Sequence, residues 1–359
     1  MFLTSYNLSG YLTASGLLDA RALVDGDFVV VEAGRRNRNF KILRRENGGL
    51  FIKQIKSLSA EATGTLRREA AFYRAIAASP AYTGLRDLTP PFVAYDERRH
   101  ILSVRLVGDA ETLAERSLYD GPCDPPTAAM LGRTLAAVHM HGPVALGDGT
   151  LRPIFTFQPP WPMMLDRTGS QFLTALGPIG PSLSQALQSH PTLAARLTAL
   201  RGSWQYDSLI HGDMKWDNCL LTGQEKKALC IVDWEMVDVG DGAWDVAGIL
   251  KEYVVAAIIP VPRPGVQEPA TTPLETLVPS ASAFWSAYAD ARQLGPSADS
   301  YFERAVRLTA ARLVIGVLEY LLGATELGEI GQRILQTSAQ ILELPHLAAA
   351  QLLGARRAA

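Results

Sequence analysis

Short β-branched and apolar runs, separated by turn residues, mark the first third of the chain and predict strands. One of these turns is Asn-Gly-Gly at 47–49, a typical hairpin sequence. Residues 57–78 instead place apolar side chains three or four positions apart, which predicts one helix. A small helix is expected within residues 1–26. The predicted strands cover residues 28–31, 40–43, 50–55, 89–95 and 100–106.

Helical spacing dominates the rest of the chain, with short strands expected at 209–221 and 228–234. Six prolines between 260 and 279 predict a surface loop. The predicted helices cover residues 127–141, 181–201, 245–257 and most of 281–353.

A sheet-rich part followed by a larger helical part predicts an α+β chain with two lobes. We expect a bilobal fold with a small antiparallel sheet in the first lobe and mostly helices in the second. The expected division is an N-terminal extension at 1–26, a first lobe at 27–107 and a second lobe at 108–359.

Composition narrows the class of protein. Apolar residues make up 48% of the 359 positions and charged residues 19%, as in a globular protein rather than a disordered one. A formal net charge of −2 argues against nucleic acid or a membrane surface as a partner. Three cysteines at unrelated spacings indicate neither a disulfide framework nor a zinc site. Without a signal-peptide pattern or a membrane-length apolar run, a soluble cytoplasmic protein is expected.

Two neighbouring segments carry the strongest chemical signal. His211 and Asp213 are followed by Asn218, five positions after Asp213, and Asp233 ends the next apolar run. This spacing is the signature of a kinase catalytic loop with its metal-binding Asp. Phosphoryl transfer from ATP needs a carboxylate that accepts a hydroxyl proton, and oxygen ligands for Mg²⁺. The sequence therefore predicts Asp213 as the base and His211 as an organiser of its loop. Asn218 and Asp233 are the predicted Mg²⁺ ligands.

A lysine in an apolar strand points to a phosphate-binding site. Lys53 lies in the run Leu-Phe-Ile-Lys-Gln-Ile, and a buried lysine needs an anion or an acidic partner. The α- and β-phosphates of ATP would supply the anion. Glu69 on the following helix would supply the partner, and Glu61 is the alternative partner.

The turn between the first two strands is rich in arginine and asparagine, with one glycine at its start. Arg36, Asn37 and Asn39 are candidates to bind phosphate through their side chains. The same basic turn, which also contains Arg35 and Arg38, could instead receive an acidic peptide or remain a solvated hairpin.

Two further carboxylates lie close to Asp233 in sequence. Asp245 precedes a predicted helix and is expected to cap it or to brace the catalytic loop. Glu235 lies two positions after Asp233 and could reach a second Mg²⁺.

The segments 211–218 and 231–248 (IVDWEMVDVGDGAWDVAG) resemble the aminoglycoside phosphotransferase and choline kinase-like family. Residues 131–139 (LGRTLAAVH) are similar to the helix that precedes the substrate region of that family. The resemblance implies a protein-kinase-like fold, with Mg²⁺ and with ATP bound at residues 106–109, where Val107 is the expected contact. The resemblance also implies the roles already inferred from the motifs: Asp213 as the base, Asn218 and Asp233 as Mg²⁺ ligands, and Lys53 as the phosphate-binding lysine. Lys215, two positions after the base, resembles the catalytic lysine of Ser/Thr protein kinases and of some family members.

The acceptor hydroxyl is less defined by the sequence. From residue 281 to the end, seven acidic residues balance seven basic ones, which does not favour a polycationic aminoglycoside. The basic turn and the residues before it resemble the stand-alone kinases of class V lanthipeptide and thioamitide-type pathways. That resemblance implies phosphorylation of Ser/Thr in a precursor peptide, followed by phosphate elimination by a separate lyase. The alternatives are a kinase of aminoglycosides or other small molecules, and a pseudokinase scaffold.

Overall fold

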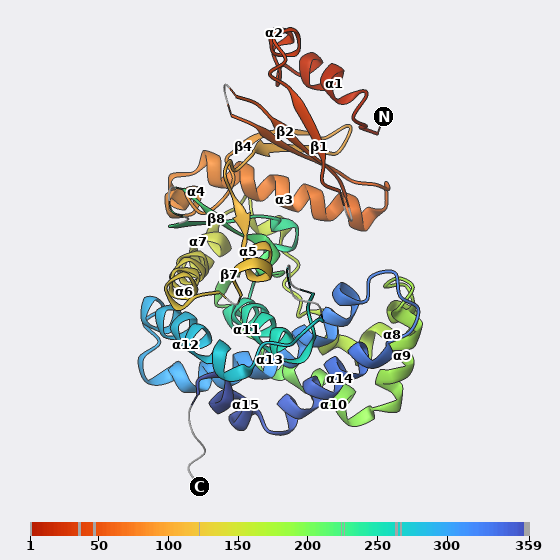
Figure 1. Ribbon diagram of the computed structural model, residues 1–359, viewed down its shortest axis with the longest axis vertical. Coiled ribbons are helices and arrows are strands. Elements are labelled where there is room, and N and C mark those ends of the chain that lie inside the picture. Colours follow the sequence, from red (N-terminus) through yellow and green to blue (C-terminus); the bar gives the residue numbers. More distant parts are fainter. Residues whose placement is uncertain are drawn as a thin grey trace. The chain divides into compact units, whose positions relative to one another are not determined.

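The computed structural model describes residues 2–34, 37–45, 48–121, 123–223, 225, 227–262, 265 and 268–354. The chain forms two compact units (Figure 1). The sheet unit comprises residues 1–111, 146–155 and 219–237, and the helical unit comprises 112–145, 156–218 and 238–359. This division differs from the predicted lobes, because 146–155 and 219–237 return to the sheet unit. No helix in the described ranges is long and apolar enough to cross a membrane.

The sheet unit is built on five antiparallel strands in the order β1-β2-β3-β5-β4. Their pairing places Lys53 of β3 between Asn39 of β2 and Leu102 of β5. Helix α3 starts after Ser59, whose side chain caps it by accepting from the Ala62 N–H. The elements are β1 (Val29–Glu32), β2 (Arg38–Leu43), β3 (Leu50–Gln54), α3 (Ala60–Ala78), α4 (Thr83–Arg86), β4 (Phe92–Asp96) and β5 (Ile101–Arg105). All five predicted strands and the helix are confirmed to within three residues at each end.

The N-terminal residues belong to the core of the sheet unit. Instead of the single predicted helix they form α1 (Leu8–Ala14) and α2 (Ala20–Val24), beside β1 and β2 in Figure 1. Leu3, Leu8, Leu12 and Leu18 are buried against Phe40, Ile42, Leu50, Ile52 and Ile101. The Leu3 N–H also donates to Oε1 of Gln54 at 2.7 Å. These contacts make residues 1–26 part of this unit rather than an extension outside it.

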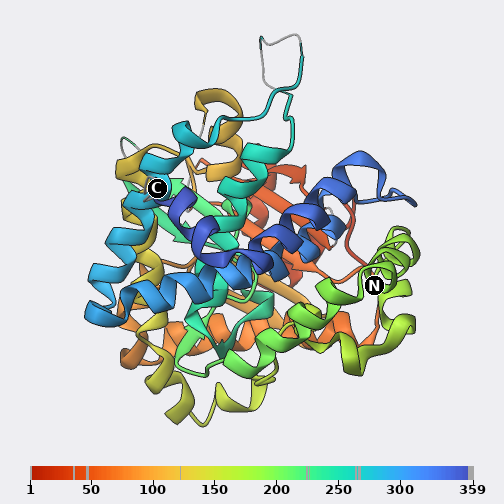
Figure 2. The ribbon, with the colours of Figure 1, turned by 90° about the horizontal axis from the view of Figure 1, so that it is seen from below.

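The helical unit contains most of the remaining helices. Those that begin before His211 are α5 (Leu113–Asp120), α6 (Pro125–His139), α8 (Leu165–Thr174), α9 (Gly180–Ser189) and α10 (Pro191–Ala199), with α7 (Gly142–Gly147) at the unit boundary. Those after it are α11 (Gly242–Ile258), α12 (Leu274–Ala291), α13 (Ala298–Tyr320), α14 (Gly328–Glu343) and α15 (Pro345–Leu352). Helices α13, α14 and α15, blue in Figure 2, pack against one another.

Prolines explain two errors in the predicted helix boundaries. The predicted helix 181–201 is divided into α9 and α10, because Pro191 disfavours helical backbone at His190 and starts a new helix. Conversely, the predicted loop 260–279 ends early, since α12 begins at Leu274 and contains Pro279. Burial of Leu277, Ala281 and Phe284 outweighs the backbone hydrogen bond that Pro279 cannot make.

Short strands flank the segments that carry Asp213 and Asp233. In the helical unit, β7 (Ser208–Ile210) pairs with β10 (Asp238–Gly240), and the loop from His211 follows β7 directly. In the sheet unit, β8 (Cys219–Thr222) pairs with β9 (Ala228–Ile231), which ends two residues before Asp233. The two-residue strand β6 (Glu111–Thr112) lies at the boundary of the units.

Helices α6 and α12 approach too closely at Gly132 for any side chain. A Cβ at this position would lie 2.3 Å from the carbonyl oxygen of Phe284 and 3.0 Å from the Tyr288 nitrogen. Gly132→Ala should therefore lower the free energy of unfolding by about 1–3 kcal/mol, because the helices must separate. Gly64→Ala on α3 is the control, since that Cβ would meet nothing within 4 Å. Urea denaturation of both variants measures the difference, and equal stabilities would contradict this packing.

Candidate functional site

The sheet unit gathers three carboxylates around one buried lysine. The Lys53 ammonium lies 2.7 Å from Glu69 and 2.9 Å from Glu235, and it also contacts Asp233. Ligand oxygens of the three acidic residues all lie within 4.8 Å of one another. Glu69 is thus the partner of Lys53, whereas Glu61 lies exposed in the first turn of α3.

Local structure fixes this cluster. Asp233 has a left-handed backbone conformation, with φ of 68°, which is unusual for a residue other than glycine. The 3₁₀ turn Trp234–Met236 follows and packs against α3, with the Trp234 ring stacked on Phe72 at 4.4 Å. The indole N–H of Trp234 donates to the carbonyl of Ile231. Asp233 and Glu235 are thereby held on either side of an anchored aromatic residue.

The charges in this cluster shift two pKa values. Burial acts to lower the pKa of Lys53, but the three carboxylates outweigh burial and raise that pKa well above its usual value. Burial raises the pKa of Glu69 to about 7, and the attraction of Lys53 offsets only part of that shift. Lys53 is therefore charged at neutral pH.

The predicted phosphate-binding residues have different surroundings. The Asn37 amide donates to Glu235 at 3.4 Å, and Asn39 is paired with Lys53 across the strands. Arg36, like Arg35, lies outside the described residues. Val107 is half-buried just after β5, next to Leu106, whose N–H donates to the carbonyl of Gly49.

In the helical unit, the loop after β7 is fixed mainly through its backbone. Asp245 is fully buried in the first turn of α11 and accepts the N–H groups of His211 and Gly212 at 2.6 and 3.0 Å. Asp241, and not Asp245, caps this helix. The His211 ring is buried, and its Nδ1 accepts the Asp213 N–H at 3.2 Å. Asp245 thus braces the loop, and His211 organises it.

Asn218 closes the same loop. Its amide nitrogen donates to the backbone carbonyl of Asp213 at 2.8 Å, and the side chain is almost fully buried. This bond fixes the orientation of the amide, with Nδ2 facing the backbone of the loop.

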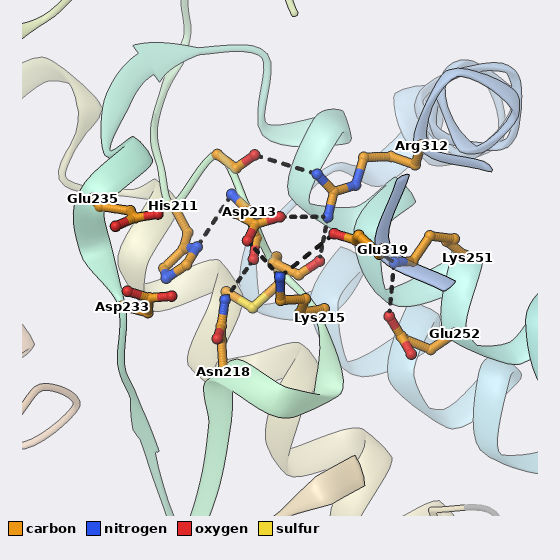
Figure 3. A network of polar contacts seen from close by, with 12 residues as sticks. His211, Asp213, Lys215, Asn218, Asp233, Glu235, Lys251, Glu252, Arg312 and Glu319 are labelled. Carbon is orange, nitrogen blue, oxygen red and sulfur yellow. Dashed lines mark hydrogen bonds and ion pairs between the residues drawn. The ribbon is translucent and has the colours of Figure 1, made fainter. Parts of the chain in front are cut away.

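The Asp213 carboxylate is bound by two cations (Figure 3). Oδ2 lies 2.7 Å from the Lys215 ammonium, and Oδ1 lies 3.3 Å from the guanidinium of Arg312 on α13. Burial acts to raise the pKa of Asp213, but Lys215 and Arg312 outweigh burial and lower that pKa below its usual value. Asp213 is therefore ionised at neutral pH.

A chain of ion pairs extends this contact to α11. Lys215 also lies 3.4 Å from Glu319, and Glu319 contacts Lys251 at 2.7 Å. Lys251, which is 1% exposed, also pairs with Glu252 at 3.1 Å. In this chain of contacts, three acidic and three basic side chains alternate around the loop.

Sequence reasoning missed Arg312, Lys251 and Glu252, and it did not connect Glu319 with the loop. Asp213 and Arg312 are 99 positions apart, so no local spacing relates them. A signal was present nonetheless, since Arg312 and Glu319 are the charged residues of an otherwise apolar helical stretch, seven positions apart. Two turns of a helix bring such residues to the same face.

Comparisons with known proteins establish the family. Residues 27–268, more than half of the chain, match the sequence model of the phosphotransferase enzyme family. A search of curated proteins found no match.

Three solved structures illustrate the shared fold. Ethanolamine kinase from Plasmodium vivax has a TM-score of 0.62 and 11% identity, covering 96% of this chain and 92% of that one. A choline/ethanolamine kinase family protein from Mesorhizobium loti has a TM-score of 0.53 and 16% identity, covering 95% and 98%. The GDP complex of an aminoglycoside 2'-phosphotransferase has a TM-score of 0.53 and 14% identity, covering 95% and 97%.

The structures show the expected α+β protein-kinase-like fold, with an antiparallel sheet in one lobe and helices in the other. The predicted resemblance to the broad family is confirmed by the sequence match. This chain belongs to the phosphotransferase enzyme family that includes the aminoglycoside phosphotransferases, and it is a phosphotransferase.

Proposed function

We propose that this protein transfers the γ-phosphoryl group of ATP, with Mg²⁺, to the hydroxyl of a small molecule, with Asp213 as the base. The observation that carries the proposal is the ionised Asp213 carboxylate, fixed at both oxygens beside an anchored loop. Lys215 is proposed to compensate charge next to the base, and His211 to keep the loop in shape. A proton acceptor must be ionised and correctly placed before its hydroxyl partner arrives.

The sheet-unit cluster has the chemistry of a nucleotide and metal site. The carboxyl groups of Glu69, Asp233 and Glu235 outnumber the single ammonium of Lys53, and this excess of acidic oxygens suits a divalent cation. We propose that Asp233 binds Mg²⁺, that Glu235 contributes a further ligand, and that Asn218 supplies an amide oxygen. When bound, Mg²⁺ neutralises phosphate charge.

Lys53 is the proposed ligand of the α- and β-phosphates, positioned by Glu69. Asn37 and Asn39, close to Glu235 and Lys53, are proposed phosphate contacts, and Arg36 keeps this role as a sequence-based proposal. Val107 is proposed to contact the adenine.

The contacts of two basic residues weaken the case for a precursor peptide as the acceptor. Arg38 binds the protein's own N-terminal segment, with its guanidinium 5.2 Å from the Phe2 ring and 3.4 Å from the Leu3 carbonyl. Lys215 is engaged by Asp213 and Glu319. Neither the family match nor the solved structures support a peptide substrate or a lyase partner, so both remain hypotheses from the sequence.

The charges around Asp213 indicate which small molecules to expect. Within the ion-pair chain, Asp213, Glu319 and Glu252 balance Lys215, Lys251 and Arg312, so the chain itself offers no net negative charge to a polycation. We therefore propose an alcohol with little net charge. The solved relatives named for choline, ethanolamine and aminoglycosides define the range of acceptors to test.

The acceptor class can be read by mass spectrometry after incubation with Mg·ATP. We expect a gain of one phosphoryl group on neutral or singly charged alcohols, and little on kanamycin or on a Ser/Thr-rich peptide, because the site lacks excess charge. GTP in parallel tests the choice of nucleotide. Phosphorylation of peptides alone would contradict the proposal and restore the precursor-peptide hypothesis. Phosphorylation of kanamycin alone would contradict the charge argument.

Glu69→Gln tests the positioning of Lys53. The variant loses the charged partner of Lys53, and we expect kcat/KM to fall by about 10–100-fold, because a misplaced ammonium binds phosphate poorly. Glu61→Gln on the same helix is the matched control and should keep the original rate. Thermal melting of both variants checks the fold. A full rate with Glu69→Gln, or an equal loss with Glu61→Gln, would remove this role from Glu69.

A further inference from the structure

Arg312 connects the distant helix α13 to the loop that carries Asp213. Its side chain is 2% exposed, in the interior of a 23-residue helix. Nη2 donates to Oδ1 of Asp213 at 3.3 Å and to the Met214 carbonyl at 2.9 Å, and Nη1 donates to the Gly212 carbonyl at 3.4 Å. One guanidinium thus contacts the Asp213 carboxylate and the carbonyl oxygens of the residues before and after it (Figure 3).

The backbone of this loop is also anchored without Arg312. Trp244 donates its indole N–H to Gly212 at 2.9 Å, and Asp245 accepts two further N–H groups. At Gly248 of α11, a Cβ would lie 2.3 Å from the carbonyl oxygen of Met214, so helix and loop are in close contact. What remains to be fixed is the direction of the Asp213 side chain.

The side chain of Asp213 has two strong partners of different character. Lys215, on Oδ2, belongs to the loop itself, is partly exposed, and is shared with Glu319. Arg312, on Oδ1, comes from outside the loop and is buried, with its guanidinium carbon 5.1 Å from the Trp244 ring centroid. A planar fork held against an aromatic ring loses little freedom when it binds, so it defines a direction better than a flexible ammonium does.

We propose that Arg312 is a positioning residue for phosphoryl transfer, which sets the rotamer of Asp213 from α13 and keeps one carboxylate oxygen directed at the acceptor hydroxyl. The inference rests on the proposed role of Asp213 as the base. Arginine is required because its fork reaches Asp213, Gly212 and Met214 together. Lysine could keep the charge but not this set of three contacts.

The test compares Arg312→Met, Arg312→Lys and, as a control on the same helix, Arg307→Met. Arg307 pairs with Glu303 on the surface, and its side chain is 47% exposed. We expect Arg312→Met to lower kcat on the order of 10²-fold, with KM for the nucleotide unchanged, because a misdirected base slows transfer and not binding. Arg312→Lys should recover part of the loss, added guanidinium ion should partly restore Arg312→Met, and Arg307→Met should match the original protein. If Arg312→Met does not fold, the kcat of folded Arg312→Lys decides.

The Asp213→Asn background separates this inference from the proposed function. If Arg312 acts through Asp213, Arg312→Lys added to Asp213→Asn should cause no further loss, since residues that act as a unit are not additive. The role of Arg312 would be overturned if Arg312→Lys lowered kcat by the same factor in both backgrounds. It would also be overturned if Arg312→Lys and Arg312→Met both kept the kcat of the unmodified protein. Full activity of Asp213→Asn itself would instead overturn the proposed base.

Discussion

Asp213→Asn is expected to lower kcat by about 10²–10⁴-fold, the usual contribution of a general base, while nucleotide affinity stays the same. The amide keeps the shape of the side chain but accepts a proton poorly. The loss should appear in kcat, because the cluster of Lys53, Glu69, Asp233 and Glu235, which we propose binds the nucleotide, does not contain Asp213. Steady-state kinetics and calorimetry with Mg·ATP measure the two quantities.

Asp217→Asn is the matched control for this experiment. Asp217 lies exposed in the same loop, one position before Asn218. It should therefore keep the original kcat. An undiminished kcat in Asp213→Asn, or an equal decrease in Asp217→Asn, would show that Asp213 is not the base.

Asp233→Asn should affect nucleotide binding rather than kcat alone, by weakening the Mg²⁺-dependent affinity for ATP. Its carboxylate contributes to the excess negative charge around Lys53, and the amide removes one of those charges. Loss of one charge from such a cluster costs about 2–3 kcal/mol, or roughly 30–150-fold in Kd. Calorimetry with Mg·ATP, with ATP plus a chelator for comparison, measures this change.

Two results would count against Asp233 as the metal ligand. One is a Kd for Mg·ATP that does not change. The other is an equal loss in Glu97→Gln, a control on the surface of the sheet unit whose side chain is 69% exposed. With the original protein, removal of Mg²⁺ should reproduce the weak binding of Asp233→Asn.

The local parts of this account were predictable from the sequence, because their signals lie within a few residues. The strands around Lys53, helix α3 with Glu69 on its buried face, and the loop from His211 to Asn218 follow from periodicity and motif spacing. The broad family was likewise predictable from the residues around Asp213 and Asp233, as the sequence match confirms.

The missing parts depend on contacts between distant segments. Arg312 reaches Asp213 across 99 positions, and the N-terminal helices enter the core through Leu3, Leu8 and Leu12. Pro279 signals a loop by itself, and only the packing of α12 against α6 explains why it is tolerated. The acceptor is hardest to predict, because Arg38 and Lys215 suggested a peptide until their partners within the protein were known.

The most direct test of the central claim is to follow the reaction with a small alcohol by phosphorus NMR, for the original protein and for Asp213→Asn. The account predicts that a phosphate monoester of the acceptor appears together with an equal amount of ADP. It also predicts that ester formation nearly ceases in Asp213→Asn, although this variant still binds Mg·ATP. Inorganic phosphate in place of the ester, or the same rate of ester formation by both proteins, would contradict it.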